Sequence, residues 1–440
     1  MNYFAGIINF DQTIVEQKDL LKMMNSVTVY NVKEYKVITD KSAGFVIYSH
    51  GRLQDGLSGY YKSMVDDIYV IADARIYNAD KVAEKLGLDD EKMNVAELIY
   101  RSYMKWGEEC LDHFVGDFAF SLWDGGNKTL FCARDHIGIR PIFYFYDKKH
   151  FLFASDLDSI IYTKNMKIKP NTKSFQNFVN GCTISDNDTF YENVFRIPPG
   201  HKLIIKNDHI SVKRYWHPDK ITLNETMTFE EASGKLRKLF IKAVKDRTPL
   251  NAKIGSELSG GLDSSSVFSV IKKYMKDVNL SSFSLRFGEY DCDEGEFIKM
   301  LIGKNNAQHY EARIDELNYK EEYNLSKIYQ INPHWPIFST YTMSIALIKE
   351  IANKGIEIGI TGQGGDQLTV GNWGHFADMF LSLKWVQLFK NIMIYKDRKF
   401  TARKLFFNYV FSTKEKYLIK KIFFPWKKTN CIETINQYTS

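Results

Sequence analysis

The run Ser-Gly-Gly-Leu-Asp-Ser-Ser at residues 259–265 constrains the fold of this chain more than any other feature. The residues before it, 253–258, have the pattern of a short strand. Apolar residues after it recur with the spacing of one helix face, at Val267, Val270, Ile271 and Tyr274. A turn that joins a strand to a helix through glycines presents backbone N–H groups and the positive end of the helix to an anion. The sequence therefore predicts a phosphate-binding turn within an α/β domain.

The chemistry of this loop differs from that of a Walker A motif, because the loop has no lysine and no G-x-x-x-x-G-K spacing. Ser264 and Ser265 offer hydroxyl donors to a phosphate, and Asp263 can hold a divalent cation. The loop resembles that of the N-type ATP pyrophosphatases, which cleave ATP between its α- and β-phosphates and release AMP. The alternative interpretation is a serine- and glycine-rich turn that binds no ligand.

A second glycine-rich loop, Thr-Gly-Gln-Gly-Gly-Asp-Gln at residues 361–367, follows another strand-like segment at 356–360. Ligands of parallel sheets bind at the carboxyl ends of the strands, so we expect the two loops to be neighbours. Asp263 and Asp366 would then hold Mg²⁺ against a triphosphate, because magnesium favours one or two carboxylates together with phosphate oxygens. The alternative is that Asp366 is an ordinary turn residue.

Composition limits the remaining possibilities. The chain has 440 residues and a net charge of +6, which allows two or three domains but gives no argument for a nucleic-acid partner. Its five cysteines form no C-x-x-C pair, which argues against a zinc site or a disulfide scaffold. The sequence shows neither a signal peptide nor a run of about 18 apolar residues. We therefore expect a cytoplasmic protein without a membrane span.

The first half of the chain is rich in short aromatic and β-branched segments. These segments predict strands at 4–10, 44–53, 68–77, 118–123, 129–133, 142–146 and 151–154, and a hairpin over 198–216 with its turn at 207–208. Helical patterns lie at 79–86 and 95–106. This mixture predicts antiparallel sheets with helices outside them, an α+β layered domain.

The second half alternates strands and helices, which predicts an α/β domain with a parallel sheet. A capping box at Thr228 to Glu231 opens a helix that runs towards Val244. Further elements are predicted as a strand at 283–287, helices at 296–305 and 341–353, and a helix C-cap at Gly355. We accordingly divide the chain into a domain at 1–216, a linker at 217–227, a second domain at 228–376 and a basic helical tail at 377–440. The basic face of the tail is either solvated or a groove for an acidic partner.

Several of these motifs together resemble the asparagine synthetase superfamily. The matching segments are A-R-D-H-I-G-I-R-P at 133–141, F-A-S-D at 153–156, R-I-P-P-G at 196–200 and the loop at 259–265. The resemblance implies a glutaminase-like domain of the N-terminal-nucleophile type, followed by an ATP-pyrophosphatase-type domain that uses ATP and Mg²⁺. It implies catalysis and metal binding by Asp263 and Asp366. It also implies nucleotide contacts at Leu258, Ser259, Gly260, Gly261, Leu262, Asp263, Ser264, Ser265, Leu285, Thr361 and Gly362.

The glutaminase half departs from the family pattern at its reactive positions. The family's catalytic cysteine follows the initiator methionine, whereas this chain has Asn2 there. The family segment N-G-E-I-Y-N appears as D-A-R-I-Y-N at 73–78, so Asp73 replaces an oxyanion-hole asparagine and Arg75 replaces a contact to the substrate ammonium. A carboxylate there would repel a developing negative charge. We expect a domain that keeps the fold without glutaminase activity.

The second loop departs too, since Gln363 and Gln367 stand where the family has glutamates. This version looks most like the lasso peptide cyclases, the macrolactam-forming members that also lack the first cysteine. The resemblance implies adenylation of a carboxylate in a precursor peptide, attack by the peptide's own amine, and a leader protease or leader-binding protein as a further partner. The alternatives are an ammonia-using asparagine synthetase, another small-molecule amide synthetase such as a β-lactam synthetase, and a non-catalytic nucleotide- or peptide-binding relative.

Overall fold

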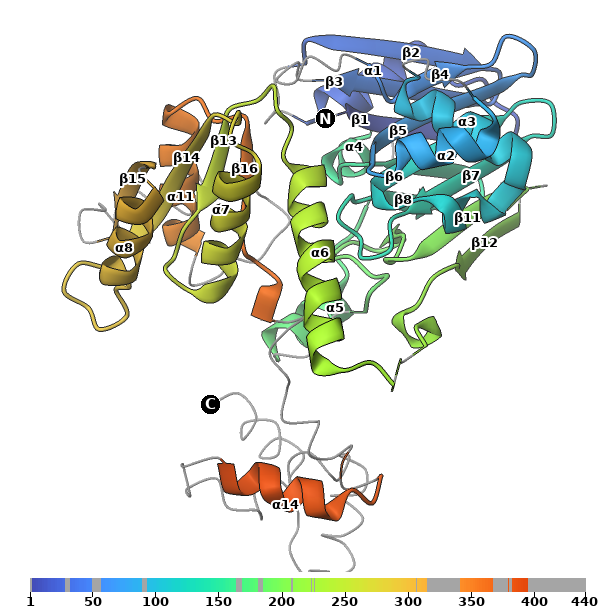
Figure 1. Cartoon of the computed structure of the whole chain (residues 1–440). Helices are drawn as coiled ribbons and strands as arrows, with labels where there is room; N and C mark the ends of the chain where they lie inside the picture. The colour runs from blue at the N-terminus through green and yellow to red at the C-terminus, as the bar shows by residue number, and fades with distance from the viewer. Residues whose placement is uncertain are drawn as a thin grey trace, which may run out of the picture.

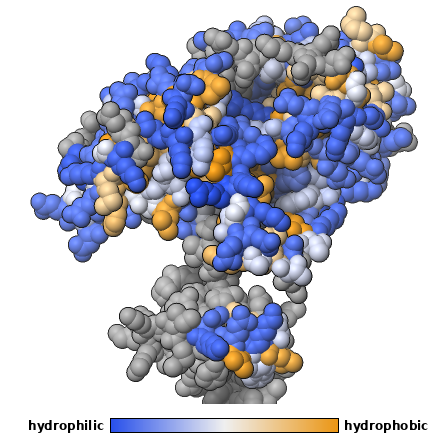
Figure 2. Space-filling model, in the orientation of Figure 1, coloured by the Kyte–Doolittle hydropathy of each residue, from blue (hydrophilic) through white to orange (hydrophobic). Residues whose placement is uncertain are grey.

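The computed structural model describes residues 2–27, 32–49, 57–88, 93–163, 168–180, 185–206, 209–222, 224, 226–305, 307–314, 341–366, 379 and 382–394. An N-terminal part contains two antiparallel sheets, and a second part is built on a parallel sheet (Figure 1). The long helix α6 (Phe229–Arg247) runs between the two parts (Figure 1). In Figure 2 most of the visible surface of both parts is hydrophilic, with separate small apolar patches.

The first sheet has six strands in the order β10-β8-β9-β1-β3-β2. Its strands are β1 (Asn2–Asn9), β2 (Glu34–Asp40), β3 (Ala43–Ser49), β8 (Phe143–Tyr146), β9 (His150–Ala154) and β10 (Val194–Arg196). β1 lies inside the sheet, where Ala5 pairs with Val46 of β3 on one side and Ala154 of β9 on the other. Both sheet neighbours of β1 therefore come from later parts of the sequence.

The second sheet also has six strands, in the order β12-β11-β7-β6-β5-β4. Its strands are β4 (Tyr60–Lys62), β5 (Ile68–Ile76), β6 (Gly116–Asp124), β7 (Thr129–Arg134), β11 (His201–Lys206) and β12 (His209–Arg214). Asp124 pairs with Thr129, so the turn-forming sequence between them closes a hairpin as the sequence predicts. The predicted hairpin turn at 207–208 lies outside the described residues.

The two sheets pack face to face with helices on both outer sides. Phe4 and Phe45 of the first sheet share a core with Ile71 and Trp123 of the second. Helices α1 (Gln17–Asn25) and α4 (Asp158–Ile161) cover the first sheet. Helices α2 (Ala79–Leu86) and α3 (Val95–Trp106), with the 3₁₀ turn η1 (Gly107–His113), cover the second. The predicted α+β layered domain, with antiparallel sheets and helices outside them, is confirmed.

The second part has four parallel strands in the order β15-β14-β13-β16. They are β13 (Ile254–Glu257), β14 (Leu280–Arg286), β15 (Gln308–Arg313) and β16 (Ile358–Ile360). The helices between them are α7 (Leu262–Tyr274), α8 (Gly295–Asn305) and α11 (Tyr341–Asn353). Ile254 and Leu258 pack against Phe268 and Ile271 of α7 in one apolar core. The predicted parallel sheet is confirmed, and β16 is a direct neighbour of β13.

The sequence predictions miss some elements and one boundary. Helices α1 and α4 and strands β2, β4, β10 and β15 are absent from them, and α6, predicted to run towards Val244, continues to Arg247. The remaining described helices are α5 (Thr172–Val179), η2 (Pro218–Lys220) and α14 (Trp385–Ile394), the last within the predicted tail. Most of that tail lies outside the described residues, and the proposed domain boundaries stay a prediction. No helix in the described part of the chain is long and apolar enough to cross a membrane.

Candidate nucleotide site

The loop between β13 and α7 is held in shape by its own serines. The backbone N–H of Ser259 donates to Oγ of Ser264 at 3.1 Å, and the two hydroxyl oxygens are 2.9 Å apart. The backbone N–H of Gly261 donates to Oγ of Ser259 at 3.3 Å. Gly260 has φ +91°, a backbone conformation that residues with a side chain adopt only with strain. The turn therefore needs its first glycine and is preorganised by Ser259 and Ser264.

The same loop leaves donors available for a ligand. The hydroxyl of Ser265, in the first turn of α7, is buried without a hydrogen-bond partner among the described residues. Gly261 is the N-cap of α7 and provides no side-chain cap, so the first N–H groups of the helix remain open. A Cβ added to Gly261 would meet its nearest neighbour, Ser259 Oγ, only at 3.4 Å. These features fit a phosphate at the positive end of α7.

The two glycine-rich loops are in direct contact. A Cβ added to Gly365 would lie 2.2 Å from Oδ2 of Asp263. A Cβ added to Gly362 would lie 2.5 Å from the backbone N of Ser264. The absence of a side chain at both glycines therefore lets the second loop press against the start of α7. The neighbouring strands β13 and β16 bring the two loops to this position.

The predicted metal ligands lie on these adjoining loops. Asp263 is half-buried in the first turn of α7, and Asp366 is exposed directly after Gly365. Two carboxylates beside a phosphate loop are a suitable donor set for Mg²⁺. Among the described residues, no group of three or more His, Cys, Asp and Glu side chains forms a cluster that would hold a metal by itself. The metal role of the two aspartates stays a prediction, and Gln367 lies outside the described residues.

The remaining predicted nucleotide contacts surround the same sheet edge. Leu258 is buried, and its carbonyl accepts a hydrogen bond from the hydroxyl of Ser284 in β14. Leu285, which follows Ser284 in β14, is half-buried. Thr361 is exposed, and its hydroxyl accepts a hydrogen bond from the backbone N–H of Gln363 at 3.1 Å. Leu262 is 86% exposed at the start of α7. All the predicted nucleotide residues thus lie at one edge of the sheet, and their individual roles stay predictions.

One charged residue at this edge was missed by the sequence interpretation. Glu257 is the last residue of β13, immediately before the phosphate loop. Burial raises the pKa of its carboxyl. The only sequence signal was an acidic residue in a strand that is otherwise apolar or small.

Asn2, at the position where the resemblance predicts a nucleophile, lies beside a buried ion pair. Asn2 is buried in β1, and its backbone N–H donates to the carboxylate of Asp73. Asp73 also forms an ion pair with Arg140, with Oδ2 and Nη1 3.2 Å apart. Burial raises the pKa of Asp73, and the positive charge of Arg140 opposes that rise. The carboxylate of Asp73 is thus engaged by Arg140 and by the Asn2 backbone, and its predicted correspondence to an oxyanion-hole residue stays a prediction.

Cys110 does not replace the missing nucleophile. It is fully buried in the core between the second sheet and its helices. Burial raises the pKa of its thiol to about 12, so the reactive thiolate is not formed at neutral pH. Cys132 is likewise buried, and burial raises its pKa to about 12.

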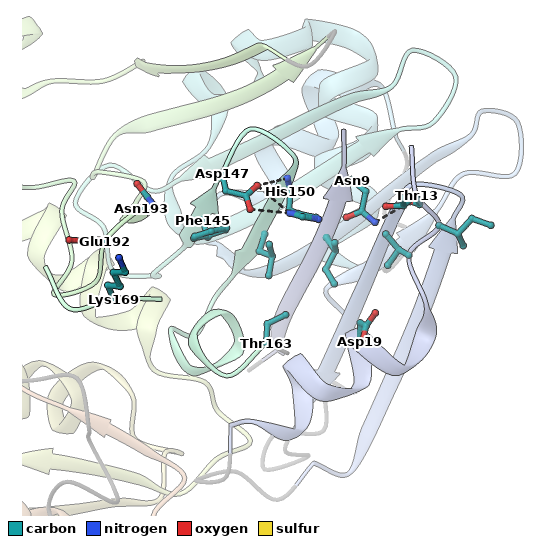
Figure 3. Close-up of a pocket in the computed structure, with 14 residues that line it drawn as sticks. Asn9, Thr13, Asp19, Phe145, Asp147, His150, Thr163, Lys169, Glu192 and Asn193 are labelled. Carbon is teal, nitrogen blue, oxygen red and sulfur yellow. Dashed lines mark hydrogen bonds and ion pairs between the residues drawn. The ribbon is translucent and has the colours of Figure 1, made fainter. Parts of the chain in front are cut away.

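A cavity of about 540 Å³ lies elsewhere, on the helix-covered side of the first sheet. Figure 3 shows Asp147 facing His150 across the hairpin of β8 and β9, with Lys169 and Glu192 on another wall. Asp147 and His150 pair at 3.1 Å, and the lining also includes apolar side chains such as Ile7 and Leu152. None of its lining residues belongs to the phosphate loop or to the Asp73–Arg140 pair. The cavity therefore takes no part in the candidate nucleotide site.

Comparison with known families agrees with this arrangement of sites. A glutamine amidotransferase domain matches residues 11–216, and an asparagine synthase domain matches residues 235–419. The chain belongs to the asparagine synthetase superfamily. The predicted superfamily is thereby confirmed, and the phosphate loop lies within the asparagine synthase match.

Relatives within the superfamily carry more than one name. A protein assigned as a glutamine-hydrolysing asparagine synthetase of Methanocaldococcus jannaschii is 30% identical over 70% of this chain and 60% of its own length. Asparagine synthetase 3 of Bacillus subtilis is 24% identical over 87% of this chain and 65% of its own length. The amidase chyE of Penicillium rubens is 26% identical over 71% of this chain and 48% of its own length. The chain thus spans less than two thirds of these relatives.

Proposed function

We propose that this member of the asparagine synthetase superfamily is an ATP-dependent amide ligase that releases AMP and pyrophosphate. A substrate carboxylate oxygen attacks the α-phosphate of ATP, the bond to the β-phosphate breaks, and pyrophosphate leaves. An amine then attacks the acyl carbon, and AMP leaves as the amide forms. The observation that carries the proposal is the packing of Gly365 and Gly362 against Asp263 and Ser264, which unites both loops at one helix start.

The residues of the first loop bind and orient the leaving pyrophosphate. The backbone N–H groups of Gly260 and Gly261 and the free hydroxyl of Ser265 would donate to phosphate oxygens. Because Ser259 and Ser264 hold the loop in advance, these donors meet the developing charge without rearrangement. Leu258, Leu285, Thr361 and Gly362 would border the nucleoside. Asp263 and Asp366 would hold Mg²⁺, which neutralises phosphate charge when bound.

Residues of the N-terminal domain bear on where the attacking amine comes from. Asn2 cannot act as a nucleophile, and Asp73 is engaged with Arg140. Loss of glutamine hydrolysis is consistent with an amine supplied by the substrate itself. We therefore propose macrolactam formation in a lasso-type precursor peptide, in which one bound molecule contributes both the acyl adenylate and the amine. A leader protease or leader-binding protein would be a further partner.

A second candidate is an ammonia-using asparagine synthetase or another small-molecule amide synthetase. The names of the relatives from M. jannaschii and B. subtilis favour it. A non-catalytic nucleotide- or peptide-binding protein is the third candidate, supported by Gln363 in place of a family glutamate. The three candidates differ in the substrates that trigger AMP release.

The deciding experiment measures magnesium-dependent release of AMP and pyrophosphate by the purified chain. One arm contains a precursor peptide encoded beside the gene, and the other contains aspartate with ammonia. Peptide-dependent AMP and a product lighter by one water would support macrolactam formation. Aspartate-dependent AMP would support asparagine synthesis instead. Nucleotide binding without AMP in either arm would contradict a ligase acting on these substrates and favour the non-catalytic candidate.

A further inference from the structure

Arg286, the last residue of β14, forms ion pairs with Asp293, which precedes α8, and with Glu311 of β15. Its Nε and Nη2 donate to the carboxylate of Asp293 at 3.0 Å each, and its Nη1 pairs with Glu311 of β15 at 2.5 Å. The side chains of Arg286 and Asp293 are only 12% and 10% exposed. A planar guanidinium holds a carboxylate through two N–H groups in a fixed geometry while a third N–H binds another carboxylate, a rigid arrangement that the ammonium of lysine does not offer. The link therefore fixes the ends of two strands relative to Asp293.

Asp293 also determines where α8 begins. Its carboxylate accepts the backbone N–H of Phe287 at 2.7 Å and that of Gly295, the first residue of α8, at 2.8 Å. The hydrogen bonds from Arg286 keep the pKa of Asp293 below its ordinary value, so the pair stays ionised at neutral pH. A Cβ on Gly295 would lie 2.2 Å from Nη2 of Arg286, so the guanidinium packs directly over that glycine.

The start of α8 is in turn the surface on which the phosphate loop rests. A Cβ built on Gly260 would lie 3.0 Å from Cβ of Glu294 and 3.2 Å from Cβ of Phe297. Gly260 is also the loop residue with positive φ. The backbone of the loop at Gly260 therefore follows the surface of Glu294 and Phe297 against which it packs. Arg286, Asp293 and the first turn of α8 thus form one continuous set of contacts that ends at the phosphate loop.

We propose that Arg286 and Asp293 are positioning residues for the phosphate loop. They fix the start of α8, and the start of α8 in turn places Gly260 for binding the pyrophosphate part of ATP. The inference rests on the proposed binding of ATP at this loop. Neither side chain needs to touch the nucleotide. Loss of the pair should therefore impair recognition of pyrophosphate much more than recognition of AMP, whose expected contacts lie mainly on β13, β14 and the second loop.

The test uses the full chain and equilibrium binding of two probes, magnesium pyrophosphate and AMP. Asp293→Asn removes the charge of the carboxylate, and Gly295→Ala places a methyl group against the guanidinium. We expect both variants to bind pyrophosphate about tenfold more weakly and AMP within about twofold of the original chain. Gly303→Ala is the matched control, because its Cβ would meet no atom of the described residues within 4 Å although it lies in the same helix.

The outcomes separate the inference from the function on which it rests. If the original chain binds neither probe, the proposed function fails and the inference fails with it. If the original chain binds both and the variants keep their pyrophosphate affinity, only the inference is overturned. Equal loss of both ligands with a lower melting temperature would reveal a merely structural role and also overturn it. Should Asp293→Asn not fold, Arg286→Lys provides the same comparison with the charge retained.

Discussion

Asp263 has two neighbours that give its carboxylate a specific place. It occupies the first turn of α7, and its Oδ2 lies 2.2 Å from the position that a Cβ on Gly365 would take. A carboxylate at the positive end of a helix would be stabilised there, but in this protein it also faces the predicted phosphate site. Its contribution to stability and its contribution to nucleotide chemistry should therefore be separable by substitution.

We expect Asp263→Asn to lower the rate of AMP formation about a hundredfold or more, because one of two expected magnesium ligands loses its charge. AMP would be measured with the substrate that supports turnover in the original chain. Asp277→Asn, an exposed carboxylate beyond the other end of α7, is the control and should leave the rate unchanged. Normal turnover by the Asp263 variant would eliminate its metal role.

The cysteines should differ sharply in their reaction with iodoacetamide at pH 8. Cys292 is exposed, whereas Cys110 and Cys132 are buried with thiol pKa values raised to about 12. We expect Cys292 to be alkylated at least about a hundredfold faster than the two buried thiols, because only the thiolate reacts. Mass spectrometry of the digested protein would give the rate at each position. Rapid labelling of Cys110 in the folded protein would show that its core opens readily.

Local sequence patterns predicted the phosphate loop but not the residues that support it. Ser259 to Ser265 are contiguous, so their spacing alone indicated the turn. Arg286 meets Asp293 through the turn that follows β14, Glu311 through the pairing of β14 with β15, and Asp73 meets Arg140 across 67 residues of sequence. Such pairs carry no local period, and long-range folding is needed to bring them together.

At the scale of single elements, the contact between the two loops depends on the absence of side chains. Gly365→Ala would place a Cβ 2.2 Å from the carboxylate of Asp263, well inside van der Waals contact. We expect the variant to bind ATP about tenfold more weakly and to lose about 1 kcal/mol of stability, because one loop must move. Isothermal titration and thermal unfolding would measure the two effects.

Gly359→Ala is a suitable comparison for that variant. Gly359 lies in β16, the strand that leads directly into the loop of Gly365, and an added Cβ would meet no atom of the described residues within 4 Å. It should keep ATP affinity. Equal affinity of the two variants would mean that the close approach of Gly365 is unimportant for the nucleotide.

Elements whose stabilisation is local were predicted best. The capping box at Thr228 is present, with the Thr228 hydroxyl and the Glu231 carboxylate each accepting a backbone N–H of the other residue. Strand β15, in contrast, reads Gln-His-Tyr-Glu-Ala-Arg, in which Tyr310 is the one residue of high strand propensity. It is a strand because it pairs along β14, and edge pairing of this kind depends on tertiary context more than on propensity.

At the scale of the whole molecule, one cluster connects the two parts. Arg247, at the end of α6, pairs with Asp117 of β6 at 3.2 Å and lies over the ring of Tyr77 at 4.5 Å. The hydroxyl of Tyr77 donates to the same carboxylate at 2.6 Å. Burial, followed by the hydrogen bond to Asp117, raises the pKa of Tyr77 above its ordinary value. Tyr77, which follows β5 in the N-terminal part, thus contacts the helix that leads into the domain with the parallel sheet.

We expect Asp117→Asn to lower the free energy of unfolding by about 1 kcal/mol, because the pair with Arg247 is partly exposed. Weaker contact between the parts should also speed proteolysis within 217–227. Denaturant unfolding and timed digestion would measure these effects. Asp246→Asn, which breaks the pair with Lys242 inside α6, should leave the proteolysis rate unchanged. Identical digestion of both variants would show that the cluster does not hold the parts together.

The place of β1 inside its sheet has a consequence for synthesis of the protein. β1 is synthesised before its partners β3 and β9, so Ala5 can pair only after Val46 and then Ala154 have emerged. During that interval the nascent chain carries an apolar strand with an unpaired edge, which is prone to aggregation. Translation speed and chaperone supply should therefore influence the yield of native protein more strongly than the stability of the finished fold.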